Sequence, residues 1–207
     1  MIVFVSMRSS DSATYVEERD AISHDWSRFF SAHGIVPVLV PNALDRPVEL
    51  LGQLPGRGLL LTGGDDLGEA PRDRTERRLL RAAVERRLPV FGACRGLQLV
   101  NLAFGGTVAR RSGEGHVAKD HPVEVTDSLG GTLPLGRFQV NSFHNDCVRT
   151  DGLAGDLRAF ALAPDGIVEG LYHPGLPITA VQWHPERPNS GQELDAALLK
   201  RWFDQCA

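Results

Sequence analysis

The sequence predicts one α/β domain of three layers, in which helices cover both faces of a mostly parallel central sheet. In the first half of the chain, short apolar runs alternate with segments whose apolar residues recur at helical spacing. In the second half, short strands follow one another across Pro and Gly turns, which predicts an antiparallel or mixed edge of the same sheet. The length of 207 residues fits a single domain over 1–207.

The expected helices and strands follow from the local spacing of apolar residues and from the positions of turn residues. Residues 15–30 are expected to be a helix, because Ala21, Ile22, Trp26, Phe29 and Phe30 share one helical face, and a polar loop is expected before it at 8–14. The other expected helices are 47–53, 75–87, 97–104 and 194–203. The expected strands are 2–6, 35–40, 58–61, 90–94, 121–126, 139–143, 159–162, 167–172 and 179–182.

Charge, apolar runs and cysteine count limit the partners and the compartment expected for the protein. A formal net charge of -4 and a pI near 6.0 argue against nucleic acid or an acidic membrane as the main partner. No apolar run approaches the roughly 20 residues of a membrane helix, and the chain starts directly as a strand without a signal peptide. The odd count of three cysteines does not form a disulfide framework, so we expect a cytoplasmic protein.

The segment 88–106 is the organising element of the chain. A short apolar run ends at Cys94, and helical spacing begins directly after it. Gly92 and Gly96 stand two positions to either side, which is typical of a nucleophile elbow with sulfur in place of oxygen. The helix N-terminus favours thiolate at that position. Cys94 is therefore the predicted nucleophile.

A cysteine nucleophile needs a base, and the base needs a group that orients it. His184 follows the predicted strand 179–182, so it is expected at a strand end as Cys94 is. Glu186 comes two residues later across Pro185, close enough to hold one imidazole nitrogen while the other faces Cys94. Two backbone N–H groups, of Arg95 and of Gly64 in the Gly-Gly turn after strand 58–61, are the predicted oxyanion donors.

Three motifs together carry a family resemblance: Cys-Arg-Gly-Leu-Gln at 94–98, Thr-Gly-Gly at 62–64 and Gln-Trp-His-Pro-Glu at 182–186. They resemble the class I glutamine amidotransferases, and within them the peptidase C26-type γ-glutamyl hydrolases. The resemblance implies a flavodoxin-like sheet, a Cys–His–Glu triad and a γ-glutamyl thioester intermediate. It also implies that Gln98 and the segment Asn141, Ser142, Phe143 and His144 bind the glutamyl part of the substrate.

A narrower resemblance is to the γ-glutamyl-CDP-amidate hydrolases of phosphoramidate and capsule polysaccharide biosynthesis. It is carried by softer motifs at 15–21 with Trp26, 41–42, 62–67, 115–118 with His121, and 140–145. It implies release of L-glutamate and cytidine diphosphoramidate from a nucleotide-linked substrate. A γ-glutamyl-γ-aminobutyrate-type hydrolase and a glutaminase subunit that passes ammonia to a synthase remain open as alternatives, and so does a homodimer.

Charge supports the narrower resemblance independently. A CDP-linked substrate is multiply anionic, so a chain of net charge -4 must supply local cations. Arg8, at the end of the first strand, and Arg19, on the expected first helix, are predicted to reach the rim of the Cys94 site. No cofactor is expected. His116 and His121 lie near Asp120, but no third and fourth ligand have suitable spacing, so no metal site is expected either.

Overall fold

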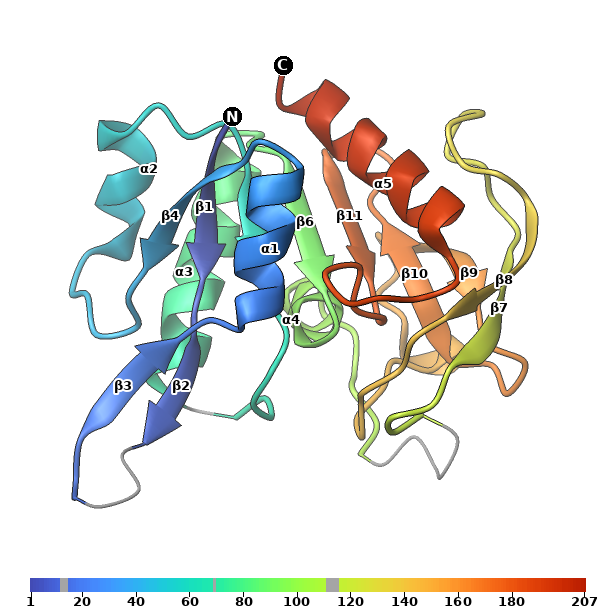
Figure 1. The fold of residues 1–207 in the computed structure, drawn as a ribbon, viewed down its shortest axis with the longest axis horizontal. Coiled ribbons are helices and arrows are strands. Elements are labelled where there is room, and N and C mark those ends of the chain that lie inside the picture. Colours follow the sequence, from blue (N-terminus) through green and yellow to red (C-terminus); the bar gives the residue numbers. More distant parts are fainter. Residues whose placement is uncertain (12–14, 69, 111–115) are drawn as a thin grey trace.

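The computed structural model describes residues 1–11, 15–68, 70–110 and 116–207. A nine-stranded sheet in the order β4-β1-β5-β6-β11-β10-β9-β7-β8 forms its centre (Figure 1). Five neighbouring strands run parallel: β4 (Val36–Val40), β1 (Ile2–Ser6), β5 (Leu59–Leu61), β6 (Val90–Ala93) and β11 (Ile178–Val181). Antiparallel pairs extend the sheet through β10 (Val168–Tyr172), β9 (Arg158–Leu162), β7 (His121–Val125) and β8 (Gly136–Val140). The predicted three-layer α/β class and mixed edge are confirmed.

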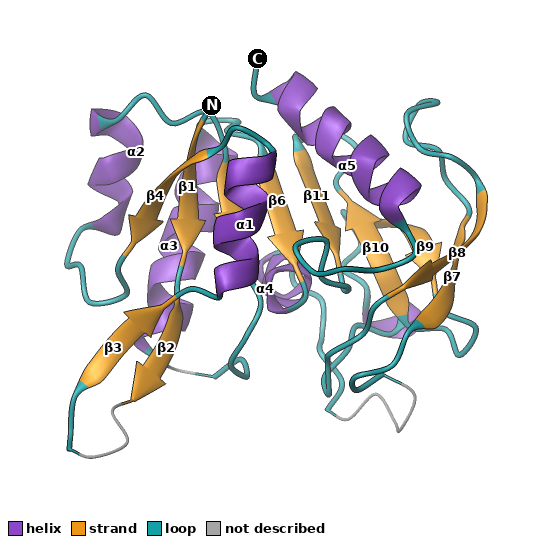
Figure 2. Cartoon of the chain, viewed as in Figure 1, coloured by secondary structure: helices purple, strands orange, loops and turns teal. Residues whose placement is uncertain are grey.

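Helices cover both faces of this sheet, and the arrows of the parallel strands point to one common edge (Figure 2). α1 (His24–Ala32) and α5 (Gln192–Gln205) pack on one face; α3 (Pro71–Glu85), α4 (Arg95–Ala103) and the short α2 (Leu50–Gln53) pack on the other. Single 3-10 turns occur at Pro47–Glu49 and Thr150–Gly152. None of the helices in these described ranges combines the length and apolarity needed to span a bilayer.

Strand alternation divides the core into two apolar layers. In β1, Val3 and Val5 join the layer under α1 and α5, whereas Phe4 joins the layer under α3 and α4. This alternation is expected because successive side chains of a strand point to opposite faces. The functional consequence is geometric: every parallel strand delivers its carboxyl end to the same edge, where the loops of a site can meet.

The helix expected at 15–30 is wrong in its first half. Residues Glu18–Ala21 form β3, which pairs antiparallel with β2 (Arg8–Asp11) as a separate hairpin, and the helix begins only after Ser23. Trp26 and the phenylalanines do form the predicted apolar face, but Ala21 belongs to the strand. The expected loop 8–14 is therefore partly strand, and its residues 12–14 lie outside the described residues, as does Gly115 of the motif at 115–118.

The strand expected at 139–143 lies earlier, as β8 at Gly136–Val140. The register explains the shift, because Val140 pairs with His121 at the end of the β7–β8 ladder. The residues that follow leave the sheet, which makes the segment from Asn141 onward available to line a site.

The close approach of α4 to β5 depends on a glycine. A Cβ at Gly96 would lie 2.4 Å from the backbone oxygen of Leu61, a distance that no side chain can occupy. Gly52, in the exposed α2, has no atom within 4 Å of its hypothetical Cβ and has no unusual φ. Of these two positions, only Gly96 therefore requires the absence of a side chain.

Gly96→Ala should destabilise the protein by about 1–3 kcal/mol through overpacking. The matched control Gly52→Ala should stabilise it by about 0.4–1 kcal/mol, because alanine reduces the entropy of the unfolded chain. Urea denaturation of both variants measures the difference. Equal changes in the free energy of unfolding would show that the close packing of α4 on β5 does not depend on the missing side chain of Gly96.

Candidate active site

Cys94 occupies a strained turn between β6 and α4. Its backbone has φ 53° and ψ -105°, a left-handed conformation that costs a residue with a side chain about 1–3 kcal/mol. The neighbouring sheet holds the turn in place, since the Cys94 amide donates to the carbonyl of Val181 at 2.8 Å. The sulfur also accepts a 3.7 Å hydrogen bond from Gln182 Nε2. This strained turn from strand to helix is the local geometry of a nucleophile elbow.

His184 and Glu186 follow β11, the strand that pairs with β6, so both ends meet at Cys94. His184 Nδ1 lies 2.7 Å from Glu186 Oε1, and both side chains are buried. Burial alone would lower the pKa of His184, but the neighbouring Cys94 and the hydrogen-bonded Glu186 carboxylate raise that pKa to about 9. At neutral pH the imidazole therefore carries a proton, as the partner of a cysteine thiolate does.

Asn141 fixes the backbone of His184 from the other side. Its Oδ1 accepts from the His184 amide at 2.9 Å, and its Nδ2 donates to the His184 carbonyl at 2.8 Å. Ser142 Oγ donates to the carbonyl of His116 at 2.7 Å and is fully buried. Both residues, predicted to bind the glutamyl group, are used to hold the protein itself together.

The Gly63–Gly64 turn is held from below by Arg72 of α3. The guanidinium of this buried side chain donates to the carbonyls of Thr62 at 2.7 Å, Gly63 at 3.1 Å and Gly64 at 2.8 Å. The carbonyl of Gly63 and the N–H of Gly64 belong to one planar trans peptide and point in opposite directions. Because the carbonyl faces Arg72, the N–H faces away from it, as an oxyanion donor needs.

Arg72 belongs to a buried ion network beneath the elbow. Its Nε donates to Glu76 at 3.0 Å, and the Arg95 guanidinium contacts Glu76 and also Asp73, the latter at 2.5 Å. The side chains of these four residues are at most 2% exposed. The side chain of Arg95 is therefore committed to the protein interior, which leaves only its backbone N–H for the site.

A cavity of about 330 Å³ opens beside Cys94. It is lined by predicted residues from several parts of the chain: Arg8, Gly64, Arg95, Gln98, Phe143, His144 and His184. Asp65 and Asp66 also line it, and they supply negative charge beside the Gly-Gly turn. Gln98 Nε2 donates to the carbonyl of Asp146 at 2.8 Å, which ties the cavity floor to the loop after β8.

Arg19 does not share this cavity. It lies on the β2–β3 hairpin and lines a second cavity with Asn42, Arg74 and Arg78, while its own guanidinium contacts Tyr15 and Glu17. The prediction that it reaches the Cys94 rim depended on the helix expected at 15–30. In the hairpin, Arg19 points to a different part of the surface.

Sequence reasoning missed Arg72 and Arg187, and it included Gln182 in a family motif without giving it a role. Arg187 lines the Cys94 cavity, and its guanidinium lies 4.3 Å from the centre of the Phe143 ring. Its place directly after Glu186 was an available signal, since a residue following the triad carboxylate remains near the site. Arg72 gave no such signal, because its role appears only when α3 is packed under the Gly-Gly turn.

The sequence profile of the Peptidase C26 family matches residues 2–186. The chain belongs to this family, and the predicted class of enzyme, a hydrolase of the peptidase C26 type, is confirmed. The γ-glutamyl-γ-aminobutyrate hydrolase of Escherichia coli K12 is 31% identical over 84% of this chain and 81% of that protein. The γ-glutamyl-CDP-amidate hydrolase of Campylobacter jejuni is 26% identical over 98% of both chains.

Solved structures agree with this assignment. A Thermoplasma acidophilum protein described as a putative GMP synthase subunit superposes with a TM-score of 0.75 at 25% identity, covering 100% of this chain and 94% of that one. A glutamine amidotransferase of Thermotoga maritima has the same fold, with a TM-score of 0.67 at 17% identity over 98% of this chain and 80% of that one. The expected class I glutamine amidotransferase fold is confirmed.

Arg72→Met should lower the free energy of unfolding by about 3–5 kcal/mol, because it leaves buried carboxylates and carbonyls without their cation. Arg81→Met on the same helix is the matched control. Arg81 pairs with Glu85 at the surface, and its loss should change stability by no more than about 0.5 kcal/mol. Guanidinium denaturation of both variants checks this; similar small changes would contradict a supporting role for the buried network.

Proposed function

We propose that this chain hydrolyses a γ-glutamyl amide bond through a glutamyl thioester on Cys94. The thiolate attacks the amide carbon, and the developing oxyanion accepts hydrogen bonds from the N–H groups of Gly64 and Arg95. The C–N bond then breaks as His184 gives its proton to the leaving nitrogen. Water attacks the thioester with His184 as base, which releases glutamate and regenerates the thiolate. Glu186 holds the imidazole in the required orientation.

The observation that carries the proposal is the convergence of Cys94, His184 and Glu186 beside a 330 Å³ cavity. The γ-glutamyl specificity is supported by relatives named for hydrolysis of γ-glutamyl compounds. The carboxylate of Asp66 at the cavity suits the α-ammonium group of a glutamyl substrate, whereas that of Asp65 is paired with Arg8 and Arg72.

Cys94→Ala should reduce hydrolysis by on the order of 10⁴-fold, and His184→Ala nearly as much, since nucleophile and base act as a unit. Glutamate release from a panel of γ-glutamyl compounds measures the loss. Intact-mass spectrometry of trapped wild-type protein should show a glutamyl adduct on Cys94, with Cys147 and Cys206 unmodified. Turnover by Cys94→Ala at the wild-type rate would remove the proposed mechanism.

The pH profile tests the role of Glu186. With the pKa of His184 near 9, the leaving nitrogen keeps its proton donor up to that pH, and kcat/KM should fall above it. Glu186→Gln removes a hydrogen bond and a charge that raise the pKa of His184, so the alkaline limb should move to lower pH while measurable activity remains. An alkaline limb at the same pH in both proteins would assign it to another group.

For the leaving group we propose a nucleotide-linked phosphoramidate of the γ-glutamyl-CDP-amidate type. Two guanidinium groups, Arg8 and Arg187, line the Cys94 cavity, and anionic phosphates are natural ligands for them. The Arg8 guanidinium packs over Gly64 and is half exposed, paired with Asp65 at 3.3 Å. The Campylobacter jejuni relative of that name is also co-extensive with this chain, whereas the Escherichia coli hydrolase aligns over a smaller share.

Arg8→Ala should raise KM for γ-glutamyl-CDP-amidate by about 10-fold to 150-fold, the loss of one charge-assisted contact of about 1.5–3 kcal/mol. It should change KM for γ-glutamyl-γ-aminobutyrate little. Arg19→Ala is the matched control, because Arg19 lines the other cavity. Equal efficiency of wild type on both compounds, or a uniform effect of Arg8→Ala, would favour the γ-aminobutyrate-type hydrolase; preference for free glutamine would favour a glutaminase subunit.

A further inference from the structure

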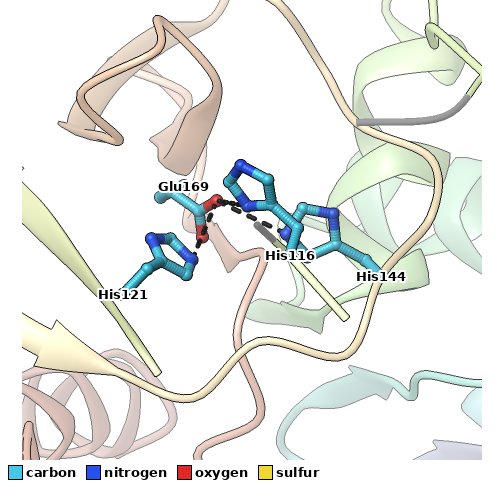
Figure 3. A group of neighbouring side chains, drawn as sticks. All are labelled: His116, His121, His144 and Glu169. Atoms are coloured by element: carbon cyan, nitrogen blue, oxygen red, sulfur yellow. Dashed lines mark ion pairs between the residues drawn. The ribbon is translucent and has the colours of Figure 1, made fainter. Parts of the chain in front are cut away.

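Four buried side chains from separate segments, none of them a member of the predicted triad, converge on one point (Figure 3). His121 begins β7, His144 lies in the loop after β8, Glu169 lies in β10, and His116 precedes β7. One ligand atom from each lies within 4.8 Å of the other three. Spacing along the chain failed to predict this group, because His144 and Glu169 reach the two earlier histidines only when the antiparallel part of the sheet forms.

The distances from Glu169 to the three histidines are close to the edge length of a coordination tetrahedron. Glu169 Oε1 lies 3.5 Å from His121 Nε2, 3.5 Å from His144 Nε2 and 3.7 Å from His116 Nδ1. These separations are long for hydrogen bonds. Ligands on Zn²⁺ at about 2.0–2.1 Å in a tetrahedron are separated by about 3.3–3.4 Å. The three distances from Glu169 therefore exceed a tetrahedron edge by only a few tenths of an ångström, and the four ligand atoms, all within 4.8 Å of one another, would draw together around the ion.

The group also contains polar atoms without a counterpart in the part of the chain that the structure describes. Both carboxylate oxygens of Glu169, with Nδ1 of His116 and Nε2 of His121, are buried and have no hydrogen-bond partner among the described residues. The Glu169 side chain is fully buried. A buried carboxylate beside imidazoles is costly without a cation or a hydrogen-bond donor. A metal ion at the centre would satisfy one oxygen of Glu169 together with His116 Nδ1 and His121 Nε2.

The ring nitrogens of the three histidines that face away from Glu169 each lie near an oxygen acceptor. His116 Nε2 lies 2.9 Å from the carboxylate of Asp165, His121 Nδ1 lies 3.2 Å from the carbonyl of Pro122, and His144 Nδ1 lies 3.1 Å from the carbonyl of Asp146. An oxygen acceptor requires the proton on that nitrogen, so the nitrogen facing Glu169 keeps its lone pair in the neutral ring. Metal-binding histidines are oriented in this way.

We propose that His116, His121, His144 and Glu169 bind a structural Zn²⁺ ion. Nitrogen and oxygen donors in a four-ligand set favour zinc, and side chains no more than 10% exposed leave no open position for substrate, as in structural sites. The ion would fasten the loop after β8 to β10. Because that loop carries Phe143 and His144 into the Cys94 cavity, the ion would hold the substrate-binding wall in place.

Metal analysis of the tag-free protein tests the site directly. We expect about one zinc per chain by inductively coupled plasma mass spectrometry, a lower melting temperature after removal with dipicolinate, and restoration by Zn²⁺ but not by Mg²⁺. Cys94→Ala should retain the zinc, since the site does not include the triad. Protein without metal, whose melting temperature does not respond to Zn²⁺, would overturn the proposal, as would loss of zinc in Cys94→Ala.

Variants give an independent test. His121→Ala should lose the zinc, whereas the exposed His24→Ala should retain it. Asp165 is half exposed, so Asp165→Ala is expected to fold, and the loss of its support for His116 should weaken zinc affinity by about 10-fold to 100-fold. The tetrahedral d–d absorption of the Co²⁺-loaded protein should likewise disappear in His121→Ala. Full zinc content in His121→Ala, with unchanged affinity in Asp165→Ala, would leave only a histidine–carboxylate cluster.

Discussion

The buried contact between Arg72 and three consecutive backbone carbonyls is the constraint on which the active-site edge depends. A guanidinium has five N–H donors in a fixed plane, so it can bind several carbonyls of one turn at once. A lysine ammonium is a compact point charge and does not match this geometry. With the carbonyls of Thr62, Gly63 and Gly64 facing inward, the turn presents its N–H groups toward the cavity side. Glu76 and Asp73 balance the charge of Arg72 and Arg95, so two cations are kept in the interior without a net charge.

The elbow and the Gly-Gly turn support each other across this network. Cys94 adopts a strained backbone conformation, and such strain persists only where the surroundings over-determine it. The amide of Cys94 is held by Val181, and the side chain of the next residue is anchored by Asp73 and Glu76. The site is therefore pre-formed, which is what electrostatic stabilisation of a transition state requires.

Features that local patterns encode could be predicted from the sequence. Cys94 between glycines and His184 two residues before Glu186 sit at strand ends, and the parallel topology alone brings strand ends together. Arg19 was misplaced because Ala21 and Ile22 continue the apolar spacing of α1 backward into what is β3. Arg72 and the group around Glu169 could not be predicted, because their partners are defined by helix packing and by antiparallel pairing between segments distant in the chain.

Asn141 uses both ends of its amide on the backbone of His184, so it ties His184 to the loop that carries Phe143. Arg187 belongs to the same linkage, because its carbonyl accepts from Asn141 Nδ2 at 3.5 Å and its guanidinium lies against the Phe143 ring. The half-exposed Arg8 comes from β2 and pairs with Asp65. In the proposed mechanism, Cys94 and His184 break the bond, and Arg8 contacts only the leaving group. Under that proposal, exchange of Arg8 would alter which amine departs and leave the residues of acyl transfer unchanged.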